Sequence, residues 1–191
     1  MKGLKNVRVY LRNVGIVTTN IGIENGRVAY IGDDGDNIES LFETDGVVLP
    51  GFIDEHIHGA GGADAMDGSV EALQTVSEYL AREGTTGFLA TTMTQSPENI
   101  TKALNAVKEI RTNGEYKGAE VLGVHLEGPF ISPKHVGAQP LEYVAVPSAE
   151  VFDKYNEVSG NSIRIVTLAP EVDGGLELIR HLKEVGVVAS V

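Results

Sequence analysis

The sequence predicts an α/β fold: about the first half of a TIM-like (β/α)8 barrel, preceded by a small antiparallel β-sandwich portion. From Val47 onward, segments rich in Val, Ile and Leu alternate with amphipathic segments, the pattern of a parallel sheet with helical crossovers. The first 46 residues show strand and turn patterns instead. A complete barrel usually needs roughly 250 residues, and only the 145 residues from Val47 to Val191 remain for it.

Residues 1–46 are expected to form the N-terminal part of a small β-sandwich domain, and residues 47–191 the barrel portion. Residues 7–32 are rich in Val, Ile and Tyr, which favours strands. Asn25-Gly26 is a strong signal for a two-residue hairpin turn. A sheet of this size is too small to hide both of its own faces.

The barrel portion divides into five predicted strands joined by four predicted helices. Ser69 and Ser96 are candidate helix N-caps, Pro97 suits a first helical position, and Gly84 suits a helix stop. The predicted strands are residues 47–57, 85–93, 119–128, 162–171 and 187–191. The predicted helices are residues 68–84, 96–114, 148–160 and 174–186. The chain ends inside an apolar run, so we expect a barrel cut roughly in half.

Composition and charge narrow the classes of function. The absence of cysteine removes disulfides, thiolate ligands and a cysteine nucleophile, so His, Asp and Glu must hold any metal. A net charge of −12, with 15 cationic against 27 acidic residues, argues against a nucleic-acid partner. No run of 18 apolar residues and no signal peptide is found, so we expect no membrane partner and a cytoplasmic location.

The stretch VLPGFIDEHIHGAGG, residues 48–62, ends the first predicted barrel strand with two histidines. His56 and His58 are two residues apart and therefore project from the same side of the strand. The carboxyl ends of barrel strands carry the chemistry of such folds, and two imidazoles there suit a divalent metal. Asp54, on the same side, is a candidate to hold an imidazole from behind. Taken alone, the pair is equally compatible with two polar residues that end a strand.

A third candidate ligand ends the third predicted barrel strand, in GVHLEGPFISP. Glu127 precedes Gly-Pro and is expected at the same mouth of the sheet as the histidine pair. His125 lies two residues earlier, where we favour a buried, hydrogen-bonded supporting role over ligation. The interpretation of His56, His58 and Glu127 as metal ligands requires that these strand ends lie close together.

The motifs PGFIDEHIHG and HLEGPFISPKHVGAQP resemble the amidohydrolase superfamily and, within it, the N-acetylglucosamine-6-phosphate deacetylase family. GADAMDG and TLAPE extend the resemblance along the chain. It implies a divalent metal (Zn, Fe, Mn or Co, one or two per site) with Glu127 as a ligand, and with His56 and His58 completing a second metal position in the two-metal members. It also implies that Ala138 and Gln139 contact a phosphorylated amino-sugar substrate, and that the protein is a homodimer.

By the same resemblance, the acid–base aspartate and further histidines of the family lie beyond residue 191. No residue of this chain is therefore nominated as catalytic, and we expect the chain alone to turn over little or no substrate. The implied reaction is hydrolysis of the acetamide of N-acetylglucosamine 6-phosphate to glucosamine 6-phosphate and acetate. Two alternatives stay open: another hydrolase of the amidohydrolase superfamily, and a non-catalytic half-barrel fragment.

Overall fold

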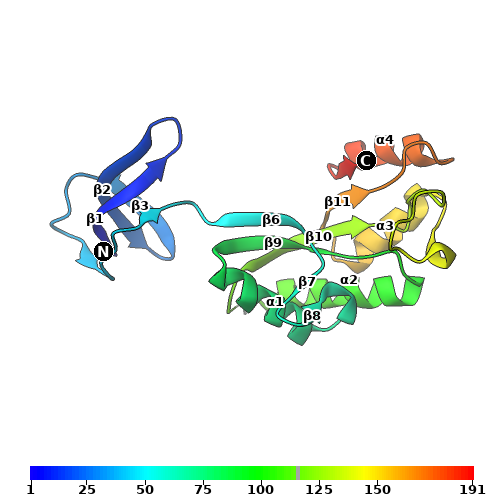
Figure 1. The fold of residues 1–191 in the computed structure, drawn as a ribbon, viewed down its shortest axis with the longest axis horizontal. Helices are drawn as coiled ribbons and strands as arrows, with labels where there is room; N and C mark the ends of the chain where they lie inside the picture. The colour runs from blue at the N-terminus through cyan, green and yellow to red at the C-terminus, as the bar shows by residue number, and fades with distance from the viewer. Residues whose placement is uncertain (115–116) are drawn as a thin grey trace. The chain divides into compact units, whose positions relative to one another are not determined.

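The computed structural model describes residues 1–114 and 117–191. The chain divides into two compact units, Met1–Pro50 and Gly51–Val191 (Figure 1). The first unit consists of strands and connecting turns, whereas the second combines strands with helices. No helix of the described residues is both long enough and apolar enough to cross a membrane.

The first unit is a small, mostly antiparallel sheet. Its strands are β1 (Lys2–Leu11), β2 (Gly15–Glu24), β3 (Arg27–Gly32), β4 (Glu39–Ser40) and β5 (Val47–Val48). The three long strands pair antiparallel in the order β3-β2-β1, while the short β4 and β5 both pair parallel with β1. The predicted hairpin is confirmed: Asn25 (φ 51°) and Gly26 (φ 72°) form the two-residue turn between β2 and β3. Both positive φ values match a type I′ turn.

The second unit contains a parallel five-stranded sheet in the order β12-β11-β10-β9-β6. Its strands are β6 (Phe52–Ile57), β9 (Thr85–Thr91), β10 (Glu120–Glu127), β11 (Ile163–Thr167) and β12 (Val188–Ser190). Every neighbouring pair is parallel. The predicted partial barrel is therefore confirmed, since sequential parallel strands joined by helices are what a half-barrel requires.

Four helices connect these strands: α1 (Val70–Arg82), α2 (Pro97–Asn113), α3 (Ala149–Val158) and α4 (Gly175–Glu184). The predicted caps are confirmed, because Ser69 Oγ accepts from the Ala72 amide at 3.1 Å and Ser96 Oγ accepts from the Asn99 amide at 3.3 Å. Figure 1 shows α1 and α2 along one face of the sheet. A continuous apolar core, formed from the strands and from each of α1 to α4, holds the parallel sheet in register.

The structure differs from the expected elements at the start of the barrel portion. The strand predicted over residues 47–57 is broken: β5 pairs with β1 of the first unit, whereas β6 pairs with β9. Pro50 explains the break, because proline has no amide hydrogen for a sheet ladder. After His58, a short hairpin of β7 (Gly59–Ala60) and β8 (Ala63–Asp64) and the 3-10 turn η1 (Ala65–Asp67) precede α1. A second 3-10 turn, η2 (Leu141–Tyr143), lies in the long loop after β10.

Candidate metal centre

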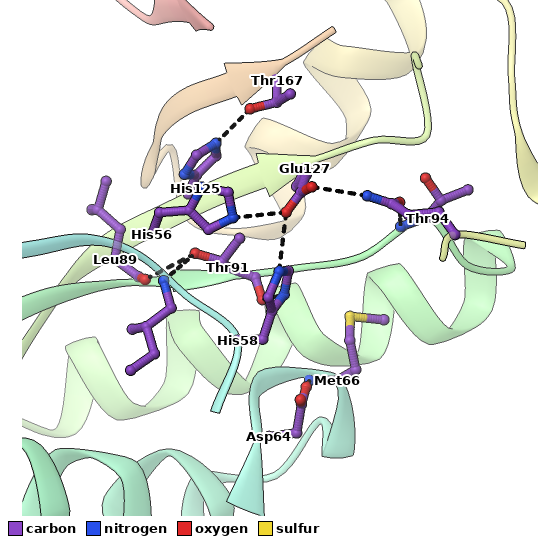
Figure 2. Close-up of polar contacts among 12 residues, drawn as sticks. His56, His58, Asp64, Met66, Leu89, Thr91, Thr94, His125, Glu127 and Thr167 are labelled. Carbon is purple, nitrogen blue, oxygen red and sulfur yellow. Dashed lines mark hydrogen bonds and ion pairs between the residues drawn. The ribbon is translucent and has the colours of Figure 1, made fainter. Parts of the chain in front are cut away.

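The three predicted ligands lie together at the carboxyl ends of β6 and β10. Glu127 Oε2 is 2.9 Å from His56 Nε2 and 3.0 Å from His58 Nε2. One possible ligand atom from each residue falls within 4.8 Å of the others. Figure 2 shows both imidazoles directed at the same carboxylate. The convergence that the sequence reasoning required is therefore present in the structure.

Hydrogen bonds to β9, the strand between β6 and β10, fix the position of the histidine pair. The backbone amide of Ile57 donates to Thr91 Oγ1 at 2.9 Å, and His58 Nδ1 donates to the Thr91 carbonyl at 3.2 Å. Asp54 does not contact an imidazole in the way suggested above. Its Oδ1 accepts from the backbone amide of His56 at 3.0 Å, so its role is to shape the end of the strand.

The tautomer of His58 bears on what the site can hold. Because a carbonyl oxygen only accepts, the bond to Thr91 places the proton of a neutral His58 ring on Nδ1. The lone pair of Nε2 then faces Glu127 Oε2 at 3.0 Å, where two lone pairs repel each other. A proton or a metal ion between these atoms removes that repulsion.

Two of the three distances between donor atoms are compatible with one metal ion. Donors bound about 2.0–2.1 Å from one ion lie about 2.9–3.4 Å from their neighbours, depending on coordination geometry. The two contacts to Glu127 Oε2, at 2.9 and 3.0 Å, lie at the short end of this range. Two imidazole nitrogens and one carboxylate oxygen suit Zn, Fe, Mn or Co.

His125 supports this arrangement through hydrogen bonds rather than as a ligand, as we favoured from the sequence. Its Nδ1 donates to the Glu55 carbonyl at 2.8 Å, and its Nε2 lies 2.7 Å from the Thr167 hydroxyl. Both ring nitrogens are therefore engaged, and the ring bridges β6, β10 and β11. Burial lowers the pKa of His125, which favours the neutral ring that can accept from Thr167. The His125 ring also packs edge-on against His56, with centroids 4.6 Å apart.

Gln139 has a contact that the sequence reasoning missed. Its Nε2 donates to Glu127 Oε1 at 3.0 Å, and its Oε1 accepts from the backbone amide of Thr94 at 2.7 Å. Nothing in the local sequence indicates this bridge, because it joins the loop after β10 to the segment that follows β9. Ala138, its neighbour in the predicted substrate contact, is exposed on the same loop.

A groove of about 570 Å³ lies elsewhere in the second unit. Its lining is formed by residues 68–70, at the start of α1, and by one face of α2: Pro97, Glu98, Thr101, Lys102, Asn105, Ala106 and Glu109. Its lining includes neither the two histidines nor Glu127. We therefore place the chemistry at the strand ends rather than in this groove.

Comparison with known proteins gives the site its context. The family model described as "Amidohydrolase family" matches residues 47–188, which include all three candidate ligands. This chain belongs to the amidohydrolase family. The resemblance drawn from HIHG and LEGPF is thereby confirmed at the level of the family.

Individual relatives refine the comparison. An N-acetylglucosamine-6-phosphate deacetylase of Bacillus subtilis (strain 168) is 44% identical over 194 residues, covering 98% of this chain and 49% of the relative. An N-acetylgalactosamine-6-phosphate deacetylase of Escherichia coli O157:H7 is 39% identical over 149 residues, covering 78% of this chain and 39% of the relative. This amidohydrolase chain thus spans about half, or less, of the length of these relatives.

A solved structure agrees with them. The crystal structure of N-acetylglucosamine-6-phosphate deacetylase from Thermotoga maritima superposes with a TM-score of 0.81 at 31% sequence identity. The match covers 98% of this chain and 47% of that one. The predicted resemblance to N-acetylglucosamine-6-phosphate deacetylases is confirmed in both sequence and fold.

Proposed function

We propose that this chain is part of a metal-dependent deacetylase that hydrolyses the acetamide of N-acetylglucosamine 6-phosphate. The products would be glucosamine 6-phosphate and acetate. The observation that carries the proposal is the single carboxylate oxygen of Glu127 facing both His56 and His58 within 3.0 Å. The 44% identity to the Bacillus subtilis deacetylase supports the substrate class.

In this proposal His56, His58 and Glu127 hold a divalent metal. Such an ion, when bound, lowers the pKa of a coordinated water toward about 7 and polarises a substrate carbonyl. Glu127 supplies the negative charge of the donor set. The His58 ring keeps Nε2 available because its Nδ1 proton is engaged by Thr91. His125 holds the ends of β6, β10 and β11 in place.

We assign no general acid among residues 1–114 and 117–191. Departure of the amine requires a proton from a positioned acid, which the resemblance places on a later barrel strand. The chain covers only 49% of its Bacillus subtilis relative, which is compatible with that assignment. We accordingly expect the 191-residue chain alone to release little or no acetate.

The test is acetate release by a longer protein that contains this chain, supplied with N-acetylglucosamine 6-phosphate and a divalent metal. We expect turnover that is lost on chelation and restored by metal. One relative is an N-acetylgalactosamine-6-phosphate deacetylase. The comparison substrate is therefore N-acetylgalactosamine 6-phosphate, the galacto epimer. Absence of acetate release from both sugars would reject the proposal, whereas a preference for the galacto epimer would correct only the substrate.

The assembly and location suggested by the sequence remain proposals with tests of their own. A homodimer rests on the resemblance and predicts a sedimentation mass of twice the monomer for the longer protein. A cytoplasmic location predicts recovery in the cytoplasmic fraction of the source cells.

A further inference from the structure

The carboxylate of Glu127 has two oxygens that face different partners. Oε2 faces His56 and His58, whereas Oε1 accepts a hydrogen bond from Gln139 Nε2 at 3.0 Å. Figure 2 shows dashed lines leaving the Glu127 carboxylate toward His56 and His58 and, in another direction, toward the side of Thr94. A carboxylate can bind a metal through one oxygen or through both, so whatever occupies Oε1 influences that choice.

The backbone fixes the direction of the Gln139 amide. The Thr94 amide hydrogen donates to Gln139 Oε1 at 2.7 Å, so the oxygen of the carboxamide must face Thr94. The NH2 group is then the end that meets Glu127. A flipped amide would set oxygen against carboxylate oxygen and NH2 against N–H, and both contacts are unfavourable.

The close packing around Gly128 keeps this bridge short. Gly128 has φ +70°, and a Cβ built on it would lie 2.0 Å from Thr94 Oγ1 and 3.2 Å from Gln139 Oε1. Any other residue would therefore strain the backbone and press on both partners of the bridge. The position next to Glu127 is thus shaped for the approach of Thr94 and Gln139.

We propose that Gln139 is a positioning residue for the metal site, which holds the Glu127 carboxylate so that Oε2 faces the histidine pair. The bridge from the Thr94 backbone through the Gln139 carboxamide to Oε1 fixes the rotation of the carboxylate. This inference rests on the proposed metal site, and it gives Gln139 a role beyond the substrate contact that the resemblance implies. Hydrogen-bonded partners of metal ligands typically contribute 10–100-fold to metal affinity.

The experiment compares the unaltered chain with Gln139→Met, which keeps the length of the side chain but removes its hydrogen bonds. Gln74→Met is the matched control, because Gln74 Nε2 donates to a carboxylate in the same way, to Glu78 Oε1 at 3.1 Å on α1. Cobalt(II) affinity and the visible spectrum of bound cobalt are measured for all three proteins. Hydrogen exchange of the Thr94 amide is measured without metal.

We expect Gln139→Met to weaken cobalt binding by about 10–100-fold, to change the cobalt spectrum, and to accelerate exchange at Thr94. Gln74→Met should leave all three readouts unchanged. Thr94 exchange that is the same in Gln139→Met would overturn the bridge, and unaltered cobalt affinity and spectrum would overturn its positioning role. Failure of cobalt to bind both to the unaltered chain and to a longer protein that contains it would sink the metal proposal itself, and this inference with it.

Discussion

The two compact units use β-structure in different ways. In the first unit, Met1–Pro50, the apolar cluster has four buried residues, Leu4, Val7, Val9 and Ile21, and side chains such as Val28 remain 60% exposed. In the second unit, the parallel sheet and each of α1 to α4 contribute to one large core. The candidate metal ligands all belong to the second unit.

The difference shows what a metal site requires of its scaffold. Ligands must be held to within about 0.5 Å of a productive geometry. Glu127 meets this requirement at the end of β10, a largely buried strand with ladders to β9 and β11. His56 lies on β6, which is the edge strand of the sheet and pairs with β9 among the described strands, so the bonds to Thr91 help to hold that strand end. The small mixed sheet of the first unit buries too little apolar surface to fix side chains in that way.

The largest effect on stability is expected when a large buried side chain is removed from the core of the second unit. Phe88 in β9 is 1% exposed, and Phe88→Ala should lower the free energy of unfolding by about 3–5 kcal/mol. Urea denaturation followed by circular dichroism measures the loss. The control in the first unit is the exposed Val28→Ala, for which we expect a change within about 0.5 kcal/mol. Equal effects of the two changes would remove the contrast between the units.

Removal of the shared ligand should strongly weaken metal binding without unfolding the second unit. In Glu127→Gln both imidazoles lose the charged oxygen that they face. We expect cobalt affinity to fall by more than the roughly 100-fold typical of a supporting residue, as measured by titration. Glu150→Gln is the control, because Glu150 pairs only with Lys154 among the contacts described on the exposed face of α3. Retention of tight binding by Glu127→Gln would exclude Glu127 as a ligand.

Substitutions of His125 and His58 distinguish a residue that supports the site from one that binds the metal. His125→Phe removes the bonds to the Glu55 carbonyl and the Thr167 hydroxyl, so we expect a loss of about 1–3 kcal/mol in the free energy of unfolding. One metal should still bind, whereas His58→Phe should lose stoichiometric binding. Metal analysis by mass spectrometry distinguishes the two. If His125→Phe lost its metal while His58→Phe kept it, the assigned roles would be reversed.

The smallest effect is expected in the first unit, at the β2–β3 turn. Gly26 has φ +72°, so Gly26→Ala should destabilise this unit by about 1 kcal/mol. Hydrogen exchange of amides in β2 and β3 reports the change locally. Cobalt affinity should not change, and a drop in that affinity would show that the first unit contributes to the metal site.

Much of the fold could be predicted because its signals are local. The cap at Ser69, the turn at Asn25-Gly26 and the alternation of strands with helices all depend on residues a few positions apart. Pro50 is itself a local signal for the break between β5 and β6, but the apolar residues on both sides of it favour one continuous strand. The hairpin after His58 was missed because GAGG specifies a turn without specifying which residues pair.

The sequence by itself predicted that His56 and His58 project to the same side at the end of a strand, because side chains alternate with a period of two. In the structure β6 ends at Ile57, and both imidazoles still face Glu127. Only the tertiary structure decided that Glu127, 71 residues from His56, lies 2.9 Å from it. It also decided that Gln139 bonds to Glu127 Oε1 and that Asp54 bonds to the backbone of His56. A local pattern reports on neighbours within one element, whereas distances between elements depend on sheet order, register and the packing of the core.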